Sequence, residues 1–394
     1  MRIIGLISGT SADGIDTALC EIEGAPPSLR ARIVAGQTYP YPPELRTRIL
    51  ASYEPSRSRV DELCRLNVEV GEVFAQAVTR IIQEAGLAPG DIDLIASHGQ
   101  TVWHDVMPDG SVHSGIQLGE GAVIAERTGI TTINNLRSRD IAAGGQGAPL
   151  AGYVDWLLLR HPTKGRAVQN LGGIGNVTFL PPLSDESSEP MAFDTGPSNA
   201  LIDDVLRLAT DGRQSFDVDG ALAHEGTVDT VWLEELLAHP YYQRHPPKTT
   251  GRELFGSAMA TELLAEGKAR GLTLADIVAT ITSLTARSVS DAYRRFAPFP
   301  IDEVILGGGG RHNPTLVAML REQLAPAQVL TQEDIGQNSD YKEALLCAVI
   351  GYETWHARAG THPAVTGARH PVVLGQITPG ANYVDLIRKT WCGG

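Results

Sequence analysis

The sequence has few cysteines and no excess of positive charge. Its four cysteines, Cys20, Cys64, Cys347 and Cys392, are scattered without a C-x-x-C pair, so neither a disulfide framework nor a zinc site is predicted. Lysine and arginine number 32 against 46 aspartate and glutamate residues, which gives a formal net charge of −14. Because such an acidic chain is a poor partner for nucleic acid or an anionic membrane surface, we expect neither as a partner.

Long hydrophobic runs are also missing. The most apolar stretch, residues 344–350, is far shorter than the roughly 20 residues that span a bilayer. The apolar run at residues 3–7 is too short for the core of a signal peptide, and no small-residue cleavage site follows it. With 394 residues, 42% of them hydrophobic, the chain is long enough for two globular domains. We expect a cytoplasmic protein with reduced thiols.

Several familiar catalytic motifs are absent. The only Gly-Lys pair, at residues 267–268, is followed by Ala269, so there is no Walker A sequence. The glycine-rich turns at 172–176 and 307–313 do not complete G-x-G-x-x-G, which argues against a Rossmann dehydrogenase. Neither a G-x-S-x-G elbow nor an H-E-x-x-H helix is present.

Glycine, in contrast, is abundant and clustered. The chain has 42 glycines, and clusters of them lie at residues 8–14, 144–147, 172–175, 196 and 307–310. Glycine lets a backbone adopt positive φ and approach a ligand closely. Tight βα turns need glycine too, so one cluster alone would indicate only a turn. Five clusters together favour a phosphate-rich ligand.

The order of predicted elements indicates a duplication. A strand at 2–7, a polar turn at 8–14 and a strand at 15–22 are repeated by a strand at 166–171, a glycine turn at 172–176 and a strand at 177–180. Further strands are expected at 91–96, 131–134, 191–193, 303–306 and 372–374, with helices at 60–82, 199–208, 256–270, 275–296 and 341–359.

This pattern predicts an α/β protein of two duplicated domains with a ligand in the cleft between them. The expected limits are 1–137 plus about 360–394 for the N-terminal domain and 138–359 for the C-terminal domain.

Two aspartates stand out chemically. Asp13 lies in a turn whose amides and hydroxyls suit phosphate oxygens, so its carboxylate would need a cation such as Mg²⁺ nearby. An ordinary turn aspartate is the alternative. Asp194 ends a predicted strand before Thr195, where it would serve as a general base or cap the helix that begins near Asn199.

Other polar groups fit a sugar. His98, Gln100, Trp103 and His104 follow a predicted strand and suit a polyhydroxylated ligand, although a lone histidine such as His98 is as readily structural. Arg137 and Arg139 flank Asp140, and a salt bridge would explain them equally well. Glu343 opens a helix, where it would favour the helix dipole or contact a metal.

Six segments, taken in order, resemble one family, the anhydro-N-acetylmuramic acid kinases. They read GLISGTSADGID at 5–16, SHGQTVWH at 97–104, AAGGQGAPL at 142–150, NLGGIGN at 170–176, FDTGPSN at 193–199 and GGGG at 307–310. Each segment is weak alone. Their order and their spread over nearly the whole chain make the resemblance specific.

The resemblance implies the fold of the sugar kinase, actin and heat-shock chaperone superfamily, with two actin- or hexokinase-like domains around a nucleotide cleft. It also implies ATP-dependent conversion of 1,6-anhydro-N-acetylmuramic acid to N-acetylmuramic acid 6-phosphate, with hydrolytic opening of the anhydro ring. That reaction belongs to peptidoglycan recycling and amino sugar metabolism. ATP and Mg²⁺ are the implied cofactors, and a homodimer is expected from the family.

Site residues follow from the matching positions. Asp194 matches the catalytic base that activates water. The ATP-binding residues are expected to be Gly9, Thr10, Ser11, Ala12, Asp13, Gly14, Ile15, Asp16, Asn170, Gly172, Gly173, Asn176, Gly307, Gly308 and Gly309. The expected sugar-binding residues are His98, Gln100, Arg137, Gly196, Asn199 and Glu343, and the acidic residues expected near Mg²⁺ are Asp13 and Glu343.

The chain departs from the family pattern at Ile7 and Ala12, which replace larger or softer apolar residues, and at two further places. Ser198 stands where the family usually has glycine, and Asn135-Leu136-Arg137 replaces the more usual Asp-Phe-Arg. The last two changes lie on the sugar side, so a kinase for another anhydro sugar such as levoglucosan, or for an ordinary sugar hydroxyl, stays open. A third hypothesis is a non-catalytic, actin-like protein that binds nucleotide without acceptor-dependent turnover.

Overall fold

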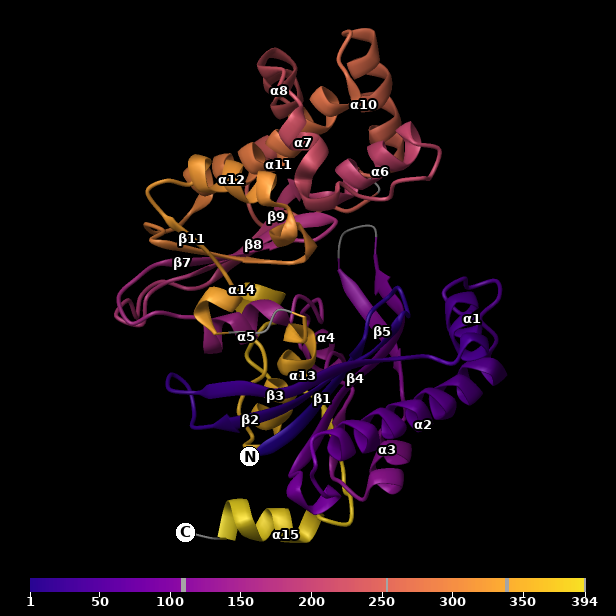
Figure 1. Cartoon of the computed structure of the whole chain (residues 1–394). Helices are drawn as coiled ribbons and strands as arrows, with labels where there is room; N and C mark the ends of the chain where they lie inside the picture. Colours follow the sequence, from indigo (N-terminus) through magenta and orange to yellow (C-terminus); the bar gives the residue numbers. More distant parts are fainter. Residues whose placement is uncertain (108–110, 253, 337–339, 393–394) are drawn as a thin grey trace. The chain divides into compact units, whose positions relative to one another are not determined.

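Figure 1 shows a computed structural model of the chain, which describes residues 1–107, 111–252, 254–336 and 340–392. The chain divides into two compact units: Met1–Leu158 with Asp340–Gly394, and Leu159–Ser339. These limits differ from the predicted 1–137 plus about 360–394 and 138–359. The difference arises because helices α5 (Ala151–Leu158) and α13 (Lys342–Trp355) pack with the first unit, where α13 lies against strand β1.

In the described part of the first unit, a seven-stranded sheet has the order β12-β6-β4-β1-β2-β3, with β5 paired to β4. The strands are β1 (Arg2–Ser8), β2 (Gly14–Glu23), β3 (Arg30–Pro40), β4 (Leu94–Val106), β5 (Val112–Leu118), β6 (Thr132–Asn134) and β12 (Gln376–Thr378). Strands β1, β2 and β3 run antiparallel in succession, while β4 lies parallel to β1 and β6 parallel to β4.

The sheet of the second unit has the order β11-β10-β7-β8-β9 in the described residues. Its strands are β7 (Arg166–Leu171), β8 (Ile174–Leu180), β9 (Met191–Pro197), β10 (Glu303–Gly307) and β11 (Gln328–Thr331). Here β7, β8 and β9 are antiparallel in succession, with β10 parallel to β7 and β11 parallel to β10. The pairing of β7, β8, β9, β10 and β11 repeats, in that order, the pairing of β1, β2, β3, β4 and β6. This repetition confirms the predicted duplicated α/β fold.

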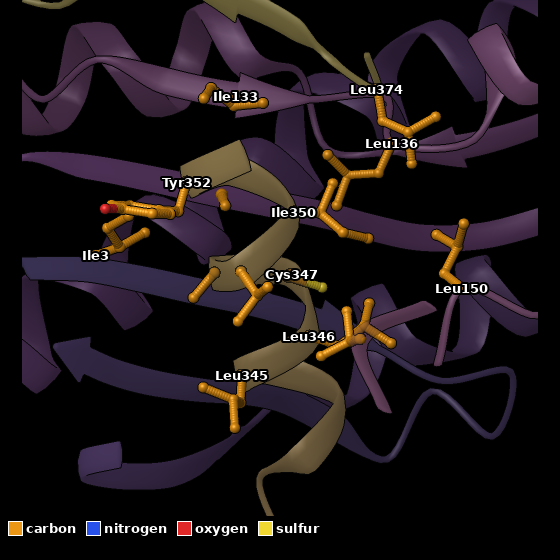
Figure 2. Packing of buried hydrophobic residues seen from close by; sticks show 14 of the residues in the cluster. Ile3, Ile133, Leu136, Leu150, Leu345, Leu346, Cys347, Ile350, Tyr352 and Leu374 are labelled. Atoms are coloured by element: carbon orange, nitrogen blue, oxygen red, sulfur yellow. The ribbon is translucent and has the colours of Figure 1, made fainter. Parts of the chain in front are cut away.

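Apolar residues cover both faces of the first sheet. On one face Leu66, Val70 and Phe74 of α2 (Val60–Glu84) pack against β1 and β4. On the other face α13 is almost wholly buried, because its apolar residues point in every direction. Figure 2 shows this helix against Ile3, Ile133 and Leu374. The remaining helices of this unit are α1 (Pro43–Ala51), α3 (Gly121–Thr128), α4 (Ser138–Ala142), α14 (Pro363–Thr366) and α15 (Tyr383–Ile387).

In the second unit, the last turns of α11 (Leu274–Phe296) and helix α12 (Pro314–Gln323) pack on the sheet, around Phe179, Phe193 and Leu306. The first turns of α11 join a helical layer centred on Trp232 and Phe255. That layer contains α6 (Asn199–Ala209), α7 (Ala221–Glu225), α8 (Thr230–Leu237), α9 (Pro240–Gln243) and α10 (Ser257–Ala269), and Figure 1 shows it above the sheet.

Two predicted elements are wrong in position. No strand forms at 372–374; the C-terminal strand is β12, which pairs with β6. The apolar residues Val372 and Leu374 are buried as irregular chain between Pro371 and Gly375, whose φ is +78°. Strand β4 continues past its predicted end to Val106, so the SHGQTVWH segment lies within a strand. No helix of the described residues is long and apolar enough to cross a membrane.

Candidate active site

The first predicted phosphate turn connects β1 to β2 in the first unit. The N–H of Ala12 donates to the carbonyl of Gly9 at 3.0 Å, and Ser8 Oγ donates to the carbonyl of Gly14 at 2.8 Å. Ala12 holds a φ of +50°, and Gly9, Thr10 and Ser11 are exposed. The turn thus presents amides and hydroxyls to solvent, which is what a phosphate requires. The side chain of Ile15 is buried in the core.

Arg46 from α1 secures this turn. Its guanidinium donates to the carbonyls of Ala12 and Ser11 at 2.9 and 3.1 Å, and to Asp13 Oδ1 at 2.9 Å. A hydrogen bond from Ser11 and the bond from Arg46 lower the pKa of Asp13. The Asp13 carboxylate is therefore already matched to a cation of the protein.

A second carboxylate lies near Glu343, one of the two residues predicted near Mg²⁺: Asp16 is close enough for its charge to act on Glu343. Desolvation raises the pKa of both Asp16 and Glu343, and the charge of Asp16 raises that of Glu343 further. A cation between two such groups would relieve that repulsion. Among the described residues there is no cluster of three or more histidine, cysteine, aspartate or glutamate side chains that would hold a metal. One or two carboxylates together with substrate phosphates is a usual Mg²⁺ ligand set.

Three predicted segments meet in the second unit. The N–H of Asn199 donates to the carbonyl of Gly172 at 3.0 Å, and its side-chain amide donates to the carbonyl of Leu171 at 3.0 Å. Gly308, with a φ of +76°, approaches so closely that a Cβ there would lie 2.5 Å from Asn170 Oδ1. The NLGGIGN, FDTGPSN and GGGG segments therefore form one contiguous group of turns.

A cavity of about 540 Å³ opens beside these turns. It is lined by Asn199, Ile202, Asp203, Ser215, Phe216, Asp217, Val218, Asp219, Gly309, Gly310, His312 and Asn313. Burial, reinforced by the neighbouring Asp204, raises the pKa of Asp203 to about 6. Gly309, one of the residues that the family resemblance predicts to bind ATP, lines this cavity.

Asp194 lies on β9, where its register partner on β8 is Asn176. Its backbone N–H donates to the carbonyl of Lys248 at 3.1 Å, and its Oδ2 accepts from the N–H of Thr250 at 2.9 Å. The hydroxyl of Tyr241 donates to the Asp194 carbonyl at 2.7 Å. The carboxylate is thus held from a neighbouring loop rather than used as a helix cap. Gly196 follows with a φ of +144°, and a Cβ there would lie 2.8 Å from the Tyr242 ring.

In the first unit His98 and Arg137 form a pair. Arg137 Nε donates to His98 Nε2 at 2.7 Å, and another nitrogen of the guanidinium donates to the carbonyl of Gly147. Burial, then the charge of Arg137, lowers the pKa of His98 to about 3, so the imidazole is neutral. Arg139 is not part of this pair; the buried Asp140 instead accepts from the N–H of Gly147 and the hydroxyl of Thr366.

Gln100 is fully buried in a different network. Its side chain accepts from Tyr41 and donates to the Tyr53 hydroxyl and the Gly9 carbonyl, at 3.2, 2.9 and 3.0 Å. Through its bond to the Gly9 carbonyl, Gln100 supports the first phosphate turn from inside the protein.

A polar cavity of about 270 Å³ lies next to His98. It is lined by Asn67, Ser97, His98, Gly115, Ile116, Gln117, Gly119, Glu120, Asn134, Asn135, Ser138 and Gln376. Ser97 Oγ and Gln117 Nε2 are buried there without a hydrogen-bond partner in the described part of the chain. Amides and hydroxyls dominate this lining, and these groups can both donate and accept hydrogen bonds.

Sequence reasoning missed Tyr241, Lys248 and Thr250, which surround Asp194. They belong to the segment between α8 and α10, about 50 residues away, which carries no familiar catalytic motif. The PPKTTGR run at 246–252, with its proline pair and its glycine, was the available signal.

Comparisons with known proteins agree with the resemblance. The family profile described as anhydro-N-acetylmuramic acid kinase matches residues 1–380. A protein of that name from Caldanaerobacter subterraneus subsp. tengcongensis is 46% identical over 383 residues, covering 95% of this chain and 96% of the relative. One from Rhodococcus erythropolis is 44% identical over 390 residues, covering 98% and 96%.

Solved structures show weaker similarity. The ADPNP-bound activator of the 2-hydroxyisocaproyl-CoA dehydratase from Clostridium difficile has a TM-score of 0.44 at 14% identity, covering 90% of this chain and 95% of that one. A glucokinase of the ROK family from Streptomyces griseus has a TM-score of 0.36 at 12% identity, covering 89% and 99%. On the strength of the family profile and the curated relatives, this chain belongs to the anhydro-N-acetylmuramic acid kinase family and is an enzyme, an ATP-using kinase.

Proposed function

We propose that this enzyme converts 1,6-anhydro-N-acetylmuramic acid and ATP into N-acetylmuramic acid 6-phosphate and ADP, with consumption of one water. In the cytoplasm this reaction would return cell-wall sugar to amino sugar metabolism. The observation that carries the proposal is the held carboxylate of Asp194, on a strand end next to the glycine turns predicted to bind ATP.

Asp194 would be the general base. Its carboxylate takes a proton from water as the water oxygen bonds to the anomeric carbon, and the bond from that carbon to the 6-oxygen breaks. The freed 6-oxygen then attacks the γ-phosphorus of ATP, and ADP leaves. Because Thr250 fixes Oδ2, Asp194 keeps one orientation relative to β9. A positioned base of this kind contributes roughly 10²–10⁴-fold to rate.

The glycine turns would bind ATP. Phosphoryl transfer depends mainly on positioning and charge neutralisation, and the amides of Gly9, Ser11 and Gly173 are placed in turns that suit phosphate oxygens. Asp16 and Glu343 would hold Mg²⁺ together with the phosphates, and the bound metal neutralises phosphate charge. The cavity beside Gly309 would take the nucleoside.

The polar cavity next to His98 would receive the polar substituents of the sugar. Its unpartnered Ser97 hydroxyl and Gln117 amide can pair with an acetamido or hydroxyl group, which would recover the cost of burying them. Asn135, at the position where the family usually has aspartate, lines the same cavity. The acceptor preference is therefore the part of the proposal most in need of measurement.

The test is ADP release with Mg²⁺ and ATP on a panel of acceptors: 1,6-anhydro-N-acetylmuramic acid, levoglucosan, N-acetylmuramic acid and no acceptor. Reaction in ¹⁸O-water should place one label on the anomeric oxygen of the product and none in its phosphate. Asp194→Asn should abolish most turnover while ATP binding persists. Asp185→Asn, in the exposed loop between β8 and β9, is the matched control.

Each outcome is decisive. Turnover of the anhydromuramic sugar with the label at the anomeric carbon supports the proposal. Preference for levoglucosan would retain the mechanism and move the protein out of cell-wall recycling. Turnover of N-acetylmuramic acid without water incorporation would contradict the ring-opening step and the role of Asp194.

A further inference from the structure

The glycine turn between β7 and β8 has two unused backbone donors. The N–H of Asn199 donates to the carbonyl of Gly172 at 3.0 Å. The N–H groups of Ser198 and Ala200 both donate to the carbonyl of Gly173, at 3.1 Å. The start of α6 therefore holds the turn by its oxygens. The N–H groups of Gly172 and Gly173 bond to no residue that the structure describes, and successive free amides in a turn favour an anion.

Arg252 reaches this turn from another segment. A Cβ built on Gly173 would lie 3.9 Å from Arg252 Nη2, so the guanidinium lies at the turn. The Arg252 side chain is 62% exposed, and its one ion pair with a described residue is with Asp204, at 3.8 Å. Asp204 already accepts a 2.7 Å hydrogen bond from Arg207. Because a second, longer pair made by an exposed arginine adds little to stability, pairing with Asp204 does not account for Arg252.

Arg311, beside the neighbouring Gly308 turn, is placed differently. Its side chain is only 8% exposed, donates to the Gly308 carbonyl at 3.1 Å and pairs with Glu333 at 3.6 Å. That guanidinium is committed to groups of the protein. Arg252, in contrast, donates no hydrogen bond to a described residue, so its donors are available to a ligand at the turn.

One short segment, residues 248–252, contacts both the proposed base and the glycine turn. It bonds to Asp194 through the Lys248 carbonyl, at 3.1 Å, and through the Thr250 N–H, at 2.9 Å. Two residues after Thr250, the side chain of Arg252 lies at Gly173. The segment therefore fixes the position of Arg252 relative to the carboxylate that would activate water.

From this arrangement we infer that Arg252 is a phosphate-binding residue: its guanidinium and the free amides of Gly172 and Gly173 bind the terminal phosphates of ATP. The planar guanidinium fork matches phosphate oxygens, and its charge is permanent. As the γ-phosphorus bonds to the sugar 6-oxygen and its bond to the bridging oxygen of ADP breaks, Arg252 offsets the charge on the moving group and gives up no proton. The inference rests on the proposed use of this turn for ATP.

The test is direct binding, measured by calorimetry with Mg²⁺ and the ATP analogue AMPPNP, and separately with adenosine. Arg252→Met should weaken the binding of AMPPNP roughly 10- to 100-fold, because hydrogen bonds between charged groups are lost. It should leave the binding of adenosine unchanged. Arg252→Lys keeps the charge but not the fork, so it should recover part of the affinity. Binding needs no acceptor, so the result does not depend on which sugar is phosphorylated.

Arg207→Met is the matched control. Arg207 pairs with the same carboxylate, Asp204, and lies closer to it than Arg252 does. No atom of Arg207 lies within 4 Å of a Cβ built on Gly172 or Gly173. Arg207→Met should therefore keep the affinity for AMPPNP, even where its melting temperature falls.

An unchanged affinity for AMPPNP in Arg252→Met would overturn the inference. An equal loss of affinity in Arg207→Met would assign Arg252 to the support of Asp204 instead, and an equal loss for adenosine would indicate general damage to the site. Binding of AMPPNP that depends on Arg252, without turnover of any acceptor, would support the inference and contradict the proposed function. Absence of AMPPNP binding by the unchanged enzyme would contradict both.

Discussion

The backbone N–H of Thr250 donates a 2.9 Å hydrogen bond to Oδ2 of Asp194, across 56 residues of sequence. This bond fixes one carboxylate oxygen, and the planar carboxylate group then defines the orientation of the other oxygen. Because backbone groups move little once a loop is packed, the donor is preorganised. Preorganised hydrogen bonds are a large source of catalytic power, since they need no rearrangement during reaction.

Tyr241 supports the same strand end, through its hydroxyl bond to the Asp194 carbonyl. Tyr241→Phe should lower kcat about three- to tenfold and reduce the free energy of unfolding by about 1 kcal/mol, the usual cost of one buried hydrogen bond. Steady-state kinetics and urea unfolding measure the two effects.

The neighbouring Tyr242 provides the matched control. Its hydroxyl is buried without a partner among the described residues, so Tyr242→Phe should leave kcat unchanged and the stability equal or higher. If both tyrosine variants behaved alike, the bond to Asp194 would have no catalytic importance.

The sequence was sufficient to predict features that are local. Apolar runs interrupted by glycine turns, as in 2–22 and 166–180, correspond to β1–β2 and β7–β8, because hairpins form between adjacent segments. It was insufficient where partners are distant. Arg46 was not expected at Asp13, nor Thr250 at Asp194, since no spacing rule connects a turn to a helix 33 residues later or to a loop 56 residues later. Nor was the hydrogen-bond network of Gln100 expected, because its partners lie on three other segments.

Gly308 tests the contact between the turns of the second unit. Gly308→Ala puts a side chain at a backbone φ of +76°. Its Cβ would lie 2.5 Å from Asn170 Oδ1 and 2.7 Å from the Leu171 carbonyl carbon. Gly271→Ala has almost the same φ, +79°, with open space around the added methyl.

Backbone strain alone costs about 1 kcal/mol at such positions. Gly271→Ala should lose that amount and retain its KM for ATP. Gly308→Ala should lose more than about 2 kcal/mol and raise the KM for ATP, because the turn must shift. Equal losses of stability with an unchanged KM for ATP would mean that this turn takes no part in nucleotide binding.

His98 should make the enzyme sensitive to acid. Its pKa in the folded protein, about 3, lies below the ordinary 6.5, so below about pH 6.5 the unfolded chain binds a proton that the folded chain does not. Stability should then fall by up to about 1.4 kcal/mol per pH unit as the pH drops from about 6 to 4. Urea unfolding at a series of pH values measures this slope.

His98→Gln keeps a hydrogen-bond acceptor for Arg137 and cannot be protonated in this range. It should flatten the acid slope, whereas His113→Gln on the exposed part of β5 should retain it. A slope that persists in His98→Gln would assign the acid sensitivity to other groups.

Asp203 and Asp204 are adjacent in α6, but removing the charge of each should have opposite effects on the stability of the protein. The pKa of Asp203 is raised to about 6 by burial and by Asp204, so the stability that its protonated form contributes is present below about pH 4 and is lost as the pH rises through about 6. Asp203→Asn should therefore stabilise the protein by about 1 kcal/mol near pH 8, after allowance for solvent screening, and have little effect near pH 4.

Asp204 is buried and already paired, with Arg207 at 2.7 Å and the Ser257 hydroxyl at 3.2 Å. Asp204→Asn removes the negative charge that pairs with Arg207, so it should destabilise the enzyme near pH 4 and near pH 8. Thermal unfolding of both variants near pH 4 and pH 8 compares them directly. Asp203 lines the 540 Å³ cavity. If the nucleoside occupies that cavity and its contacts favour the ionised carboxylate, an ATP analogue should reduce the stability gained by Asp203→Asn. An unchanged gain would place the nucleoside elsewhere.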